Sequence, residues 1–182
     1  FAGIGVGALA GAALSFLSVA APVSAAQQIL AWIAGDLNGA GPDRAALVWL
    51  GLALGLPLSA LCLRHLDLIA LDPASAVSLG LDTRAARLAL IGVAVLLAAT
   101  ATAAAGIVVF VGLVGPHMAR RMAGARHAAM LPVAVATGAL LVAIADLAGR
   151  TVFAPVQVPA GIVAALVGAP WFLYMMRRTR HG

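Results

Sequence analysis

Two ionisable side chains stand close together near the end of a long apolar stretch. Asp146 and Arg150 are four residues apart, so an α-helix would place them on one face. A carboxylate and a guanidinium at this spacing can form an ion pair, which reduces the cost of burying Asp146. We therefore predict a structural ion pair, and both residues are candidates for function because ionisable groups within apolar segments usually have one.

A second polar element follows another apolar stretch, at residues 116–124. Pro116 precedes His117, Arg120 and Arg121, which fall within about one helical turn and would present a basic face. No second metal ligand lies at useful spacing from His117, so we expect a structural or interface role for it and no metal site. The preference of membrane proteins for cytoplasmic arginine would also place Arg120 and Arg121 here.

Missing residue types exclude several classes of protein. The sequence has no Lys, so it has no Gly-x-x-x-x-Gly-Lys phosphate loop, and any ATP chemistry would belong to a partner. It has no His-Glu-x-x-His motif, nucleophile elbow or paired buried carboxylates, so we expect no enzyme activity. Its arginines occur in short groups without interleaved aromatic residues, which argues against nucleic-acid binding. An ion-coupled secondary transporter that uses Asp146 remains an alternative.

Composition defines the surroundings of the chain. Apolar residues make up 64% of the 182 positions and charged residues 9%, too little charge for a water-soluble surface. We predict an all-α integral membrane protein. A helix needs roughly 20 apolar residues to cross the bilayer. Five spans meet this length, and a sixth is short or interrupted at Gly115-Pro116; they are about 1–21, 44–63, 84–104, 106–122, 128–149 and 158–176.

The arginines are divided unequally by these six crossings. Arg44 and Arg150 fall on one side, and nine fall on the other: Arg64, Arg84, Arg87, Arg120, Arg121, Arg126, Arg177, Arg178 and Arg180. Because arginine is enriched in cytoplasmic loops, we expect the second side, with the C-terminus, to be cytoplasmic. The sequence begins without Met or a charged leader, so we expect one transmembrane domain over residues 1–182, truncated at its N-terminus.

Two connections between spans contain helix signals. In the polar loop 64–83, Asp72 is a candidate N-cap, Pro73 suits a first helical turn and Gly80 is a candidate stop, which predicts a short helix over 73–79. Between the first two spans, residues 25–34 form an amphipathic piece with Trp32 at headgroup level. This piece is either a connecting helix or a gate.

Two spans carry faces of small residues that would allow close approach of another helix. The first span has Gly3, Gly7 and Gly11 at four-residue spacing. The last span has Gly161 and Gly168. We predict helix packing at both faces.

Nearly the whole sequence resembles the second half of a known family's pattern. Asp146-Leu-Ala-Gly-Arg150, Val158-Pro-Ala-Gly-Ile-Val-Ala-Ala-Leu-Val-Gly-Ala-Pro170 and the segment 110–120 are similar to the C-terminal half of FecCD-type permeases. These are membrane subunits of ATP-binding-cassette (ABC) importers for iron-siderophores, haem or vitamin B12.

The resemblance implies six of ten spans in a permease that imports its substrate through the bacterial inner membrane by alternating access. The implied partners are a second permease subunit, two ATPase subunits that bind ATP and Mg²⁺, and an extracytoplasmic substrate-binding protein. It implies no cofactor on this chain.

The resemblance also assigns roles to particular residues. Loop 64–83 corresponds to the cytoplasmic coupling loop that contacts the ATPase, with matches at Leu71, Ala76, Leu79 and Gly80 and a departure at Asp72-Pro73. Arg150 corresponds to an arginine that receives a carboxylate of the binding protein, a role that suits a planar, permanently charged group. Arg44 is a weaker docking candidate. Gln157 replaces a glutamate that is usual in the family, so no role of that glutamate is carried over.

Overall fold

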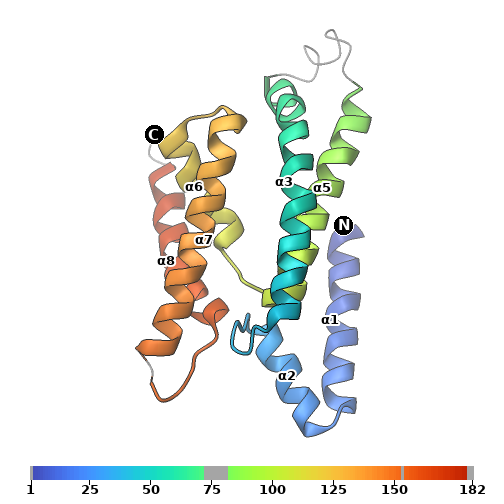
Figure 1. Ribbon diagram of the computed structural model, residues 1–182, viewed down its shortest axis with the longest axis vertical. Helices are drawn as coiled ribbons and strands as arrows, with labels where there is room; N and C mark the ends of the chain where they lie inside the picture. The colour runs from blue at the N-terminus through green and yellow to red at the C-terminus, as the bar shows by residue number, and fades with distance from the viewer. Residues whose placement is uncertain (1, 72–81, 153, 180–182) are drawn as a thin grey trace.

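The computed structural model describes residues 2–71, 82–152 and 154–179, and its secondary structure over these residues is entirely helical. Figure 1 shows the arrangement. The helices are α1 (Ala2–Ala20), α2 (Val23–Ile33), α3 (Pro42–Leu71), α5 (Thr83–Ala105), α6 (Val111–Ala123), α7 (His127–Thr151) and α8 (Ala160–Thr179). The predicted all-α fold is confirmed, and α2 confirms the short helix expected at residues 25–34.

Four of these helices are long and apolar enough to cross a membrane. They contain the stretches Gly3–Ala20, Pro42–Ala70, Thr83–Ala105 and His127–Thr151. Helix α8 has a shorter apolar stretch, Ala160–Met175. Four of the predicted spans are thus confirmed as apolar helices of sufficient length.

The predicted sixth span is broken at a different place from the one expected. Helix α6 continues through Gly115-Pro116, and the break lies over residues 106–110, between α5 and α6. Gly106 ends α5 with φ of 74°, and Phe110 precedes α6 in a left-handed conformation with φ of 70°. Helix α6 has 13 residues, about 20 Å, so an extended segment and a short helix together return the chain to the other end of the molecule (Figure 1).

Pro116 lies inside α6, as the sixth of its 13 residues. It removes the donor for the carbonyl of Gly112, and its ring is exposed, yet the helix continues to Ala123. The sixth span is therefore short, one of the two forms expected, whereas the break expected at Gly115-Pro116 was wrong. Gly115 serves packing instead, because a Cβ at this position would lie 3.3 Å from the carbonyl oxygen of Ala134 in α7.

The helices form two groups (Figure 1). In the first, α3 packs along α5, and α1 packs against α2. In the second, α7 packs against both α6 and α8, and a small apolar core of Ala145, Ala160, Val163 and Ala164 lies between α7 and α8. Between the groups, α3 contacts α7.

Glycine permits the close packing of α3 on α5. Gly51 and Gly55 of α3 are buried, and a Cβ at Gly51 would come within 2.5 Å of the Thr100 hydroxyl oxygen. Asp82 starts α5 as a true N-cap, accepting hydrogen bonds from the backbone N–H groups of Arg84 and Ala85, each at 3.0 Å.

The arginines lie near the two ends of the molecule. The end of α3, the start of α5, the end of α6, the start of α7 and the end of α8 lie at one end, which we call the arginine-rich end (Figure 1). Within about two turns of these helix ends lie Arg64, Arg84, Arg87, Arg120, Arg121, Arg126, Arg177 and Arg178. Arg44 and Arg150 lie at the opposite end, which we call the Arg150 end. This division matches the one expected from sequence, while Arg180 lies outside the described residues.

Candidate functional site

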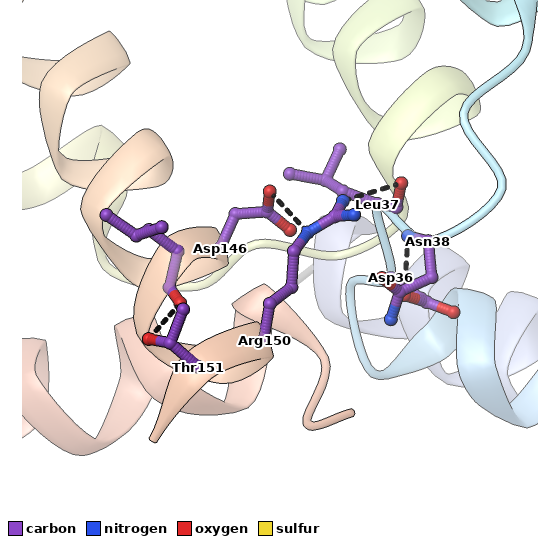
Figure 2. Close-up of polar contacts among 7 residues, drawn as sticks. Asp36, Leu37, Asn38, Asp146, Arg150 and Thr151 are labelled. Carbon is purple, nitrogen blue, oxygen red and sulfur yellow. Dashed lines mark hydrogen bonds and ion pairs between the residues drawn. The ribbon is translucent and has the colours of Figure 1, made fainter. Parts of the chain in front are cut away.

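Arg150 and Asp146 form an ion pair at the last turns of α7. The Arg150 Nε donates to Asp146 Oδ2 at 2.8 Å, four residues back along the helix (Figure 2). The side chain of Arg150 is 44% exposed and that of Asp146 26% exposed. The pair therefore holds one side of the guanidinium and leaves much of the group open to a partner.

Arg150 also reaches the connection between α2 and α3. Its NH2 group donates to the carbonyl oxygen of Leu37 at 3.5 Å, the long limit of a hydrogen bond (Figure 2). In the same connection, the N–H of Asn38 donates to Asp36 Oδ1 at 2.8 Å, which forms an Asx turn. Asn38 Oδ1 is buried and has no hydrogen-bond partner among the described residues. The guanidinium thus bridges a helix of one group and a turn of the other.

Three glycines from separate segments position this turn. Gly35 follows α2, Gly106 ends α5 and Gly161 lies in the first turn of α8; all three are buried, and we call them the glycine junction. The N–H of Gly161 donates to the Gly35 carbonyl at 3.0 Å, and the N–H of Ile107 donates to the Trp32 carbonyl at 3.3 Å. Gly35 has φ of 75°, and a Cβ there would come 2.9 Å from the Gly161 Cα. Only glycine therefore fits at position 35 without displacing the backbone of α8.

The other candidates at this end do not join the pair. Arg44 is exposed in the first turn of α3, and no contact of its side chain with Arg150 is found among the described residues. Gln157 is exposed in the segment between α7 and α8. The chemistry available at the Arg150 end is recognition of an anionic group, because the Arg150 fork has donors that neither Asp146 nor Leu37 uses.

The predicted basic element lies at the arginine-rich end. Arg120 and Arg121 are exposed in the last turn of α6. His117 is half-buried, and its ring makes an edge contact with Trp171 of α8, with centroids 5.9 Å apart. His117 thus packs α6 on α8 while the two arginines face solvent.

Most of the predicted coupling segment cannot be placed. The predicted start of the loop at residue 64 was wrong, because α3 continues as a helix to Leu71. The expected helix 73–79 lies outside the described residues together with Asp72, Pro73, Ala76, Leu79 and Gly80. Their roles stay predictions.

The two glycine faces differ in their surroundings. A Cβ at Gly168 would touch Phe110, 2.5 Å from its Cβ, so α8 approaches the α5–α6 connection closely there. At Gly3, Gly7 and Gly11, no described atom lies within 4 Å of a Cβ position. No described residue covers this face of α1, and its packing role stays a prediction.

Sequence reasoning missed one polar contact between the helix groups. Asp67 of α3 and His127 of α7 are 60 residues apart, and the Asp67 carboxylate contacts the His127 ring at the arginine-rich end. No spacing motif joins them, and only the position of each beside a predicted span could have drawn attention to them. Among the described residues, no group of three or more His, Cys or Asp side chains could hold a metal ion.

The fold and the position of its polar groups define a class. Four long apolar helices, with arginine concentrated at one end and a bridging arginine at the other, are features of a multi-pass membrane protein. The profile of the FecCD transport family matches residues 1–178, and the chain belongs to this family.

Individual relatives agree with this assignment. The chain is 40% identical over 151 residues to the Fe(3+) dicitrate transport system permease protein FecD of Escherichia coli (strain K12), covering 83% of this chain and 48% of that protein. It is 36% identical over 182 residues to the hemin transport system permease protein HmuU of Yersinia pestis, covering 98% and 54%. The chain thus spans about half the length of these curated relatives.

A solved structure shares the fold. It is described as an inward-facing conformation of a metal-chelate type ABC transporter, and it superposes with a TM-score of 0.85 at 26% identity, covering 96% of this chain and 58% of that one. None of these proteins is described as an ion-coupled secondary transporter, and the carboxylate of Asp146 is paired with Arg150. The alternative based on Asp146 therefore gains no support.

Proposed function

We propose that this chain is part of the permease subunit of an ABC importer that moves an iron chelate across the bacterial inner membrane. The observation that carries the proposal is the match of residues 1–178 to the FecCD transport family. The fold supports it, because the shared structure is that of a transporter described as metal-chelate type. We infer iron citrate, a siderophore or haem as the substrate class, since relatives bear the names of iron-citrate, siderophore and hemin permeases.

The unequal division of arginine gives the proposed orientation. Eight described arginines lie at one end and two at the other. The positive-inside preference then puts the arginine-rich end and the C-terminus in the cytoplasm and the Arg150 end outside.

Two contact surfaces follow from this orientation. Outside, Arg150 and, more weakly, Arg44 would receive carboxylates of a substrate-binding protein, and the 44% exposure of Arg150 leaves room for one. Inside, the loop 64–83 and the basic end of α6 would contact an ATPase subunit, one of two in the importer that bind ATP and Mg²⁺. A second permease subunit would complete the pathway. The chain would carry no cofactor and perform no hydrolysis, because it has no phosphate loop.

Reconstitution tests this function directly. The complete permease would be placed in lipid vesicles with its ATPase, and a loaded binding protein would be supplied outside with an iron-labelled citrate, hydroxamate or haem chelate. We expect one class of chelate to accumulate in the vesicle lumen. This accumulation should require ATP in the lumen, on the side of the membrane where the ATPase is bound. Uptake driven by a proton or sodium gradient without ATP would contradict the proposal.

A further inference from the structure

The two helix groups are joined at their two ends by contacts of different kinds. At the Arg150 end, a backbone hydrogen bond of the glycine junction joins them, from the N–H of Gly161 to the carbonyl of Gly35, while the bond from Ile107 to Trp32 ties the connection that leads to α6 onto α2. At the arginine-rich end, the join is a pair of side chains, Asp67 and His127. Backbone contacts between buried glycines leave little freedom to separate, whereas a side-chain pair can open by rotation of either side chain.

Asp67 binds His127 through one oxygen. Its Oδ1 accepts from the ring Nδ1 of His127 at 2.5 Å and from the backbone N–H of His127 at 3.2 Å. An ionised carboxylate only accepts hydrogen bonds, so Nδ1 carries a proton in this pair. His127 is the first residue of α7, and the N-cap residue Arg126 provides no capping hydrogen bond of its own. Asp67 therefore caps α7 from a different helix, where a negative charge is also favoured.

The pair is placed where it can transmit movement. Asp67 lies four residues before Leu71, the end of α3, and so in the part of the predicted loop 64–83 that is helical in the structure. His127 lies at the turn between α6 and α7. Its side chain is 16% exposed and that of Asp67 is 45% exposed, so water can replace either partner when the pair opens. Exposed pairs of this kind contribute little to overall stability, which suits a contact that has to open.

We propose that Asp67 and His127 form a latch that holds α3 on α7, and that its opening lets the α6–α8 group turn away from α3 and α5 about the glycine junction. The role of the latch in transport rests on the proposed function, in which movement of the loop 64–83 would pull Asp67 away from α7. The structural part, a separable contact between two helix groups, does not depend on it.

The chain provides a reporter beside the latch. Cys62 is the only cysteine of this sequence, is half-buried on α3 and lies five residues before Asp67. It lines an apolar pocket together with Leu66 of α3, Leu90 of α5 and Leu131 of α7. Separation of α3 from α7 would therefore expose its thiol.

The test measures the rate at which maleimide labels Cys62 in the complete permease in lipid nanodiscs, with any other cysteines of the complete protein replaced. Asp67→Leu removes both hydrogen bonds, and we expect labelling to be about fivefold faster or more. Asp67→Asn keeps an acceptor oxygen and His127→Ala keeps the backbone N–H, so both should give smaller increases. Asp43→Leu changes an exposed carboxylate at the other end of α3 and should leave the rate unchanged.

Folding is checked for each variant by its elution as a single species and by its unfolding midpoint. If Asp67→Leu does not fold, the two milder variants decide. If Asp67→Leu folds and is labelled at the unaltered rate, the latch is overturned. If it does not fold, labelling of both milder variants at the unaltered rate overturns the latch.

A second experiment locks the latch with a reversible covalent bond. Asp67→Cys with His127→Cys, in a Cys62→Ser background, should form a disulfide on oxidation that stops ATP-driven uptake and should recover uptake on reduction. Full uptake with the disulfide formed would overturn the transport role. Absence of uptake in every sample, the unaltered permease included, would count against the proposed function instead, and the labelling rates would still decide whether the latch exists.

Discussion

The guanidinium of Arg150 donates to the carbonyl oxygen of Leu37, which precedes it by 113 residues. Through this bond the end of α7 touches the turn that follows α2, beside the glycine junction. A partner that binds Arg150 from outside would thus act on both helix groups at once. The ion pair with Asp146 fixes the direction of the Arg150 guanidinium, because the Arg150 Nε lies 2.8 Å from Asp146 Oδ2 (Figure 2).

Arg150→Glu tests the proposed docking role. A carboxylate at this position would repel an acidic partner and would also face Asp146, so we expect binding of the substrate-binding protein to weaken by about tenfold or more. Lowering the salt concentration should strengthen the remaining affinity less than it does for the unaltered permease. Titration of the binding protein on the complete permease at two salt concentrations would measure both effects. Arg150→Lys keeps the positive charge and should lose less affinity for the binding protein than Arg150→Glu. Unchanged affinity of Arg150→Glu would contradict the docking role.

The glycine junction gives a prediction with an internal control. Gly35→Ala and Gly39→Ala both place a side chain at positive φ, 75° and 73°, and each should lose about 1 kcal/mol from backbone strain. At Gly35 the new Cβ would also come 2.6 Å from the Ile107 carbonyl oxygen, whereas nothing described lies within 4 Å at Gly39. We expect Gly35→Ala to lower the unfolding midpoint clearly further than Gly39→Ala. Equal midpoints would show that the junction is not tightly packed in solution.

Apolar length predicted four of the long helices well. Spans over 84–104 and 128–149 correspond to Thr83–Ala105 and His127–Thr151, because an apolar helix in lipid needs no information beyond its own length and its polar ends. The Asp146–Arg150 contact was predictable for a similar reason, since both residues lie on one helix at a fixed spacing.

Contacts between distant segments were not predictable from the sequence alone. Nothing local brings Asp67 to His127, or Gly106 to Gly35, because these approaches depend on how the helices pack. The helix break was misplaced for a related reason. Pro116 looked like the stronger breaker, but the left-handed backbone at Gly106 and Phe110 ends one helix and starts the next.

Deletion of residues 73–79 tests the coupling role of the loop 64–83. These residues lie outside the described part of the chain, and the prediction rests on the family and on their place after α3 at the arginine-rich end. We expect the deleted permease to insert into the membrane and to lose its ATPase on purification. Replacing the same residues by a glycine and serine linker of equal length separates loss of contact from a shortened loop. Stoichiometric ATPase on the deleted permease would refute the coupling role.

Pro116→Ala tests whether α6 is a continuous helix in solution. Proline in a helix interior costs about 3 kcal/mol relative to alanine, and the exposed ring of Pro116 has little packing to lose. Alanine would restore a donor for the carbonyl of Gly112, so we expect a higher unfolding midpoint. Pro42→Ala is the matched control, because Pro42 is the first residue of α3, where proline costs nothing and is often favoured. If Pro116→Ala lowered the midpoint while Pro42→Ala did not, Pro116 would stabilise the fold and the expected gain from a complete α6 hydrogen-bond ladder would be refuted.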